Sequence, residues 1–188
     1  MTDNIARWRA EHGNFAKLLD LLERQLALFR KGDAPNYGLI LDVMYYMTHY
    51  PDRFHHPKED LAFARIKERE AGARAVVDEL MRQHVVLRES GEELVAHLDG
   101  IVNGAAILAR ESVEAPGRTY VEYFRNHMHK EEAELFPSAL TVLRNEDWAT
   151  IDAVMHERDD PLFGRALEER YEAVHRQIAM EAGCACDK

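Results

Sequence analysis

The sequence has few of the residues that build turn-rich or disulfide-linked folds. Its 188 residues include 10 glycines, 6 prolines and 2 cysteines. So little glycine and proline argues against an all-β fold with many tight turns. Both cysteines, Cys184 and Cys186, lie in the last few residues, where they cannot crosslink a core. A cytoplasmic location is therefore expected.

Long apolar runs and an excess of basic residues are also missing. No run approaches the roughly 20 apolar residues of a membrane span, and the N-terminus has no apolar stretch typical of a signal peptide. The 34 acidic residues exceed the 24 basic ones, giving a net charge of −10. Because phosphate backbones and anionic lipids repel such a chain, neither nucleic acid nor membrane is an expected partner. Histidine, by contrast, is abundant, with ten residues.

Apolar residues at steps of three and four predict helices throughout the chain. Breaks are expected at Glu70–Ala73 and at Pro51 and Pro57, where the missing backbone donors predict a kink. The stretch from Gly100 to Gly117 stays unassigned. The predicted main helices run from Ile5 to the turn at Gly32–Pro35, from about Tyr37 to Lys67, from Val77 to Ile101, and through Tyr120 and Leu135 to an end near Pro137.

The C-terminal part also reads as helical. A short helix is expected around Trp148–Met155, and Asp160 with Pro161 predicts the start of a last helix that reaches about Met180. The fold class is thus all-α, an up-down four-helix bundle with additional C-terminal helices. The predicted organisation is a metal-binding bundle at 1–140, a helical extension packing on it at 141–182, and a disordered tail at 183–188.

Polar side chains interrupt each apolar stripe at one place. Two stripes carry a single histidine, and the other two carry an H-x-x-x-E pair, which puts an imidazole and a carboxylate one turn apart on one helix face. These residues are His12, His55, Glu59, His84, His127 and Glu131.

The spacing of these positions predicts that they meet. In an up-down bundle with short loops, residues at equal height are equally far from the turn between their helices. The midpoint of His12 and His55 falls within Gly32–Pro35, and that of the 55/59 pair and His84 falls beside Gly72. We therefore expect the six side chains to form one layer inside the bundle.

A layer of this composition calls for a cation. Two unpaired buried carboxylates cost several kcal/mol each, and no Lys or Arg lies in these stripes. Mixed imidazole and carboxylate ligands suit iron or manganese better than structural zinc, and two carboxylates able to bridge suggest two metal ions. Without a cation, burial and mutual repulsion are expected to raise the pKa of Glu59, Glu131 or both.

The chain resembles the hemerythrin-like (HHE cation-binding) domain proteins from about Asp3 to Ser138. The resemblance implies a four-helix bundle with a non-haem di-iron centre, bridged by Glu59 and Glu131, that reacts with dioxygen or a related oxidant such as peroxide or nitric oxide. Two iron ions are the implied cofactor, with manganese or zinc as alternative occupants. The motifs that carry the resemblance are Glu11-His12, His55–Asp60, His84, His127–Glu132 and Leu135–Pro137.

Two departures separate this chain from the oxygen-carrying hemerythrins. Those have a second histidine one turn after the position of His84, where this chain has Arg88, and an H-x-x-x-x-D motif where His127 is followed by Glu131 and Glu132. These departures argue against reversible oxygen carriage and favour oxidant chemistry, or the sensing or handling of iron or oxygen. The alternative is a helical interaction or regulatory module with a purely structural metal site. Whether the protein is a monomer or a homodimer stays undecided.

The remaining candidate residues are given structural roles. His56 and Asp60 form a second, shifted pair; the likeness between the two H-x-x-x-E segments favours His55 and Glu59, and His56 stays open as an extra ligand. Tyr45, Tyr120 and Tyr123 flank the layer and are interpreted as core packing, with donation to a bound oxygen species as the alternative. Surface or capping positions are assigned to His49, His97, His129, His156 and His175.

Overall fold

The computed structural model describes residues 2–104, 110–154 and 159–183, and every regular element within these ranges is helical. Short π turns (η1, η3) and 3-10 turns (η2, η4) join or flank the α-helices. In chain order the elements are α1 (Thr2–Lys31), α2 (Tyr37–Tyr50), η1 (Pro51–His55), α3 (His56–Arg69), η2 (Ala71–Ala73), α4 (Arg74–Val102), α5 (Glu111–Lys130), η3 (Glu131–Leu135), α6 (Phe136–Val142), α7 (Asn145–Val154), η4 (Glu169–Tyr171) and α8 (Glu172–Gly183).

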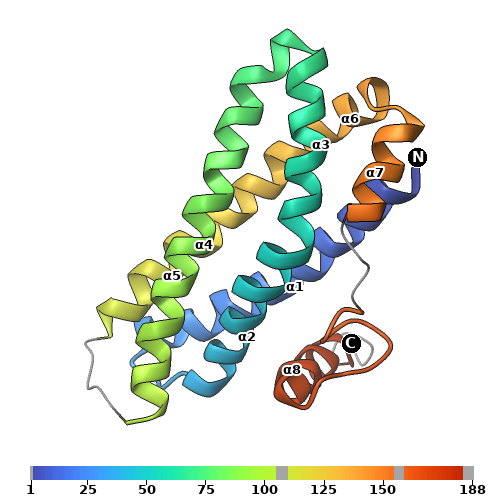
Figure 1. Ribbon diagram of the computed structural model, residues 1–188. Helices are drawn as coiled ribbons and strands as arrows, with labels where there is room; N and C mark the ends of the chain where they lie inside the picture. Colours follow the sequence, from blue (N-terminus) through green and yellow to red (C-terminus); the bar gives the residue numbers. More distant parts are fainter. Residues whose placement is uncertain (1, 105–109, 155–158, 184–188) are drawn as a thin grey trace.

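Four long rods make up the bundle, as the all-α prediction requires (Figure 1). They are α1, the continuous α2–η1–α3, α4, and the continuous α5–η3–α6. Short turns reverse the chain at the expected places. Gly32 adopts a left-handed φ of 78° at the end of α1, and the Asn36 side chain accepts the Leu39 N–H at 3.0 Å at the start of α2. Both are the chemistry expected of a helix end and a helix start.

Two π turns let the rods pass their prolines. The N–H of His56 bonds to the carbonyl of Pro51, and the N–H of Phe136 bonds to that of Glu131, each five residues back. Pro57 and Pro137 follow directly. At the place where a kink is expected, near Pro51 and Pro57, the structure has the π turn η1. The expected helix end near Pro137 is wrong: because the wider turn absorbs the missing proline donor, the rod continues to Val142.

The polar layer lies between two apolar clusters. One cluster contains Phe15, Tyr46 and Phe124, and the other contains Trp8 and Phe136, all of them buried. Each rod contributes to both clusters, so its polar residues are enclosed from above and below along the bundle axis. Apolar packing on both sides fixes the height of the layer, as the equal-height argument requires.

Close backbone approach explains two glycines. Gly117, in the stretch left unassigned by sequence, lies inside α5, where a Cβ atom would come within 2.9 Å of Leu26. Gly91 lies inside α4, where a Cβ atom would come within 2.5 Å of Thr48 Cγ2 and 3.2 Å of the Tyr120 ring. The Thr48 hydroxyl is held by the Met44 carbonyl at 3.0 Å, so Thr48 cannot easily turn away.

We therefore expect Gly91→Ala to destabilise the protein by about 1–3 kcal/mol, in the range of an overpacked core. Urea denaturation measures the change. Gly13→Ala is the matched control, because Gly13 is also helical and a Cβ atom there would meet nothing within 4 Å. It should leave stability unchanged or raise it by up to about 1 kcal/mol. Equal effects at both positions would contradict the packing argument.

The C-terminal segment packs on the bundle at two places. Trp148 of α7 contacts Trp8 of α1, with ring centroids 5.6 Å apart, and α8 lies beside α2. The expected helix start at Pro161 is wrong. Asp160 does accept the N–H groups of Leu162 and Phe163, at 2.9 Å each, but the Glu168 N–H returns to the Pro161 carbonyl. This closes a loop, and α8 begins only at Glu172.

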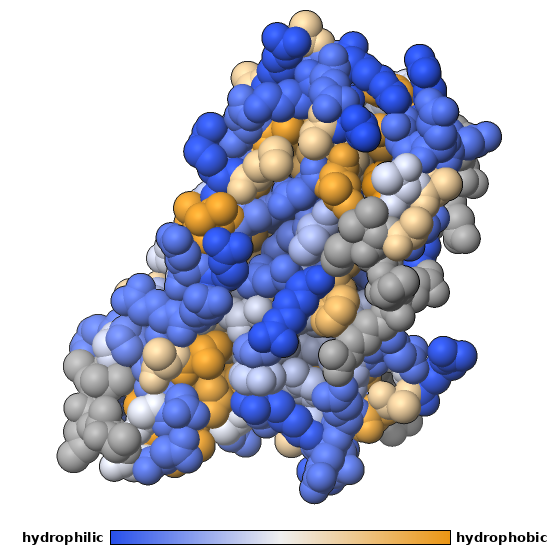
Figure 2. All heavy atoms as spheres, in the orientation of Figure 1, coloured by the Kyte–Doolittle hydropathy of each residue, from blue (hydrophilic) through white to orange (hydrophobic). Residues whose placement is uncertain are grey.

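Some predicted features lie outside the described residues. They are Met155 at the end of the expected short helix, His156, and the cysteines Cys184 and Cys186 of the expected tail. Gly183, the first residue of that tail, belongs to α8. None of the helices in the described ranges is long and apolar enough to cross a membrane. The face in Figure 2 is largely hydrophilic, with small separate apolar patches.

Candidate metal centre

One buried layer contains all six side chains that the spacing brings together, and His56 joins them. Exposure within this layer runs from 0% for Glu59 and Glu131 to 6% for His84. The four rods each contribute: α1 gives His12, the second rod gives His55, His56 and Glu59, α4 gives His84, and the fourth rod gives His127 and Glu131. The polar atoms fall into two adjoining groups that share no residue, and a third set, Glu59, His84 and Glu131, overlaps both; each is of a size that can hold a cation.

The first group consists of His12, His55 and Glu59. The Nε2 atoms of the two histidines are 3.1 Å apart. Glu59 Oε1 lies 3.1 Å from His55 Nε2 and 3.7 Å from His12 Nε2. Three ligand atoms from two rods therefore converge on one point.

The second group consists of His56, His84 and His127. The His56 ring stacks on the His84 ring at 4.3 Å between centroids, and the His127 ring meets the His84 ring edge-on at 4.7 Å. The sequence left His56 open and favoured His55. The structure places both in the layer, with His55 in the first group and His56, directly after the η1 turn, in the second.

Both glutamates reach both groups. Glu59 places Oε1 on the His12 and His55 side and Oε2 at 3.7 Å from His84 Nε2. Glu131 places Oε1 at 3.2 Å from the Nε2 atoms of His84 and His127, and Oε2 at 3.5 Å from His12 Nε2. A carboxylate with one oxygen on each side is the geometry of a bridging ligand.

The Nδ1 atom of each of the five histidines in the layer, which points away from the ligand groups, contacts a side-chain oxygen. Such partners fix the tautomer and turn the other nitrogen towards a metal. Sequence reasoning did not find these contacts: it paired Asp60 with His56 and did not assign Asp52 or Gln83 a role. The partners come mostly from neighbouring rods, and only Asp52, one turn before His56, has a helical spacing. The Nδ1 contacts are His12 with Glu132 (2.8 Å), His55 with Glu11 (2.6 Å), His56 with Asp52 (3.0 Å), His84 with Asp60 (2.8 Å) and His127 with Gln83 (3.0 Å).

The side chains also set one another's charges. Burial acts to lower the pKa of His55, but Glu59 and Glu11 outweigh it and raise that pKa to about 10. The pKa of His84 likewise rises to about 10, because Asp60 and Glu131 outweigh its burial. Burial and the neighbouring His84 hold the pKa of His56 well below its ordinary value, so that this imidazole is neutral.

The expectation of raised glutamate pKa values is wrong. Burial and the charge of Glu131 act to raise the pKa of Glu59, but the imidazoles of His55 and His12 outweigh them and lower it. Burial also acts to raise the pKa of Glu131, and His127 and His84 instead hold it well below its usual range. Both carboxylates are therefore ionised and ready to bind a cation.

A metal ion fits this donor set. Both oxygens of Glu59, Oε2 of Glu131 and Nε2 of His127 are fully buried and have no hydrogen-bond partner among the described side chains. Buried polar atoms without partners are costly unless a cation satisfies them. These four atoms all point into the layer where the two groups meet, so the centre itself would satisfy them.

The other histidines described lie apart from the two groups. His129 and His175 are exposed, as expected. His49 stacks on Tyr45 at 3.7 Å and contacts the Tyr45 carbonyl through Nδ1. Tyr120 packs against Phe124, in agreement with a core role. His97 is partly buried, and it too lies away from the centre.

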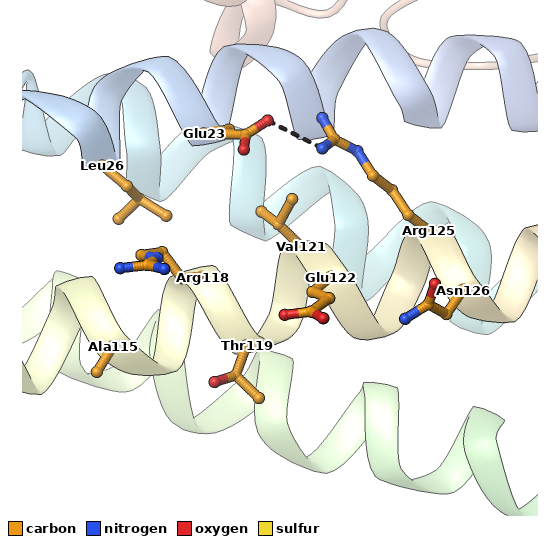
Figure 3. A pocket seen from close by; sticks show the side chains of 9 residues that line it. All are labelled: Glu23, Leu26, Ala115, Arg118, Thr119, Val121, Glu122, Arg125 and Asn126. Carbon is orange, nitrogen blue, oxygen red and sulfur yellow. Dashed lines mark hydrogen bonds and ion pairs between the residues drawn. The ribbon is translucent and has the colours of Figure 1, made fainter.

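The groove in Figure 3 is also separate from the centre. It has a volume of about 450 Å³ and lies between α1 and α5. Arg125 crosses it to reach Glu23 at 2.9 Å, and the same guanidinium contacts Asp20. Because these charges pair with each other along an open surface, the groove offers no buried ligand set.

Comparison with known proteins agrees with this geometry. No curated protein and no solved structure matches the chain. Residues 3–139 match the family described as the hemerythrin HHE cation binding domain. That range contains all four rods except Thr2 of α1 and the last residues of α6, and it includes every residue of both ligand groups. The chain therefore belongs to the hemerythrin HHE cation-binding family.

Proposed function

We propose that this protein holds a non-haem di-iron centre that reacts with dioxygen or a related small oxidant. The observation that carries the proposal is the position of Glu59 and Glu131, each with one oxygen near each ligand group. In helical bundles, inward-facing carboxylates and histidines of this kind hold paired metal ions. The first ion would be held by His12 and His55, and the second by His56, His84 and His127.

The donor set favours iron over a structural zinc ion. All candidate ligand atoms are imidazole nitrogens or carboxylate oxygens, whereas structural zinc sites are usually rich in thiolates. When bound, iron would supply the redox chemistry that protein side chains of this layer lack. A cytoplasmic location, expected from the terminal cysteines, is part of the same proposal.

The chain's own residues orient the ligands and limit what can enter. The Nδ1 partners, four of them carboxyl groups, fix the rings and make the Nε2 atoms better donors. His12 stacks on Phe136 at 5.3 Å and Phe15 meets His55 edge-on at 5.1 Å, so the walls are apolar. Since no ligand is more than 6% exposed, a dioxygen, peroxide or nitric oxide molecule suits the site better than a large substrate.

His56 changes the argument about oxygen carriage. From the sequence, the site has one imidazole fewer than the oxygen-carrying hemerythrins, because α4 carries only His84. The structure adds His56 from the second rod, which gives five imidazoles in the two groups. An experiment therefore has to separate the two functions. Reversible oxygen carriage gives a spectral change that reverses when oxygen is removed, whereas oxidant consumption gives a net loss of the oxidant.

We expect protein produced with iron to contain about two iron ions per chain. Elemental analysis measures the metal, and the near-ultraviolet spectrum should change when a reductant is added and again when oxygen is admitted. The opposite result is a colourless protein that contains zinc, or one ion only, and does not respond to reductant. That result would favour the alternative, a helical regulatory module with a structural metal.

A further inference from the structure

Tyr50 connects a candidate metal ligand to the edge of the bundle. Its hydroxyl donates to Glu11 Oε1 at 3.2 Å, and Glu11 Oε2 accepts from Nδ1 of His55 at 2.6 Å. The Nε2 atom of the same histidine belongs to the first ligand group. Two hydrogen bonds thus link a phenol to the metal centre through one carboxylate.

A second tyrosine extends this connection. The Tyr46 ring stacks on Tyr50 with centroids 5.4 Å apart and planes at 20°. Its hydroxyl donates to Asp160 Oδ2 at 2.7 Å. Each of the two buried phenols therefore has its own carboxylate partner. Burial and the charge of Glu11 raise the pKa of Tyr50, so the phenol keeps its proton at rest.

The path ends at a cavity. A pocket of about 130 Å³ lies where the second rod meets the C-terminal segment, and its lining includes Tyr50, Arg53 and Tyr171. Tyr171 also meets Tyr46 edge-on at 5.6 Å. Asp160 and Tyr171 lie beyond the 3–139 range that matches the family, so the C-terminal segment completes this arrangement.

We propose that Tyr50, with Glu11 as its proton acceptor and Tyr46 as a second ring, is a one-electron relay between the metal centre and this cavity. The proposal rests on the di-iron function above. Tyrosine can give up one electron, but a buried phenol cation is costly, so its proton must leave at the same time. Glu11 and Asp160 provide the places for that proton.

The reaction balances with hydrogen peroxide as oxidant. Peroxide takes up two electrons and two solvent protons and gives two water molecules. Bound iron would supply one electron and Tyr50 the other, and a second electron from the reductant named below, passed along the same path, would return the iron to its starting state. Its O–H bond breaks, the proton passes to Glu11 Oε1, and a neutral tyrosyl radical remains. A small one-electron reductant of the ascorbate class, entering the cavity, returns the electron, and Glu11 returns the proton.

The test is electron paramagnetic resonance of iron-loaded protein frozen soon after mixing with hydrogen peroxide. We expect a tyrosyl radical signal that ascorbate removes. Tyr50→Phe should lose most of this signal at unchanged iron content. Tyr37→Phe is the control and should keep it, because Tyr37 starts α2, 18 residues from His55, or about 27 Å along a helix.

A second measurement avoids any change of fold. A spin trap added to the wild-type reaction, followed by peptide mapping, should mark Tyr50 or Tyr46 and leave Tyr37 unmarked. The relay is overturned if iron-loaded protein consumes peroxide without a radical, or if the trap marks only other residues. A protein that binds no iron would instead overturn the di-iron function, and the metal analysis of each sample distinguishes the two failures.

Discussion

Removal of iron by a chelator should lower the melting temperature of this protein by about 10 °C or more at neutral pH. The ligands come from all four rods and meet only in the folded bundle, so bound metal stabilises the native state. A site held at a thousand times its Kd contributes about 4 kcal/mol, and each kcal/mol moves the midpoint of a chain this size by roughly 2–4 °C.

Readdition of iron is the control and should restore the original midpoint. An unchanged midpoint, in a sample shown by metal analysis to have lost its iron, would mean that the layer does not clamp the rods together. A chelated sample that still contains iron would have to be depleted further before the comparison.

The same melting curves, repeated across pH, should show that the chelated protein loses stability both as the pH falls into the acidic range and as it rises into the alkaline range. The lowered pKa values of Glu59 and Glu131 stabilise the fold above their ordinary value of 4.5, and this is lost as the pH falls. The pKa values of His55 and His84, raised to about 10, stabilise it below 6.5, and this is lost as the pH rises towards 10.

Iron-loaded protein should behave differently on the alkaline side. Metal binds the deprotonated imidazole, so the loaded protein should keep its midpoint where the chelated protein loses stability. On the acidic side protons compete with the metal for the ligands, and the melting midpoint of the loaded protein should fall. A chelated protein that gains stability from pH 6.5 to 10 would contradict the charge pattern described for the layer.

Replacing His56 by alanine should reduce the iron content from about two ions per chain to about one. His56 is one of three imidazoles in the second group, and the first group, which includes Glu59, would still hold the other ion. Elemental analysis after gel filtration measures the loss.

Replacing a residue that contacts the outer nitrogen of a ligand should have a smaller effect. Gln83→Ala, which removes the partner of His127 Nδ1, should weaken metal binding by about 10–100-fold.

His49→Ala is the matched control for His56→Ala. His49 is also a histidine of the second rod, in α2 rather than α3, but it stacks on Tyr45 and belongs to neither group. Its replacement should leave both ions in place. Equal losses from the two variants would show that the second rod presents a different face to the centre.

Much of the bundle could be predicted because it follows from local patterns. Steps of three and four in the apolar residues predict helices, since that spacing matches the helical turn. Gly32 and the break at Glu70–Ala73 mark where the chain reverses. Equal distances from those turns then place His12, His55 and His84 at one height. The pattern needs no knowledge of how the rods pack.

Tertiary structure decided what depends on the path of the backbone and on contacts between rods. On an ideal helix His56 would point about 100° away from His55, but the π turn ahead of Pro57 lets both face the interior. Glu11 holds His55 rather than its neighbour His12, and Asp60 holds His84 rather than His56. Such pairings join residues that are distant in the chain, so only packing selects them, and with them the raised pKa values of His55 and His84.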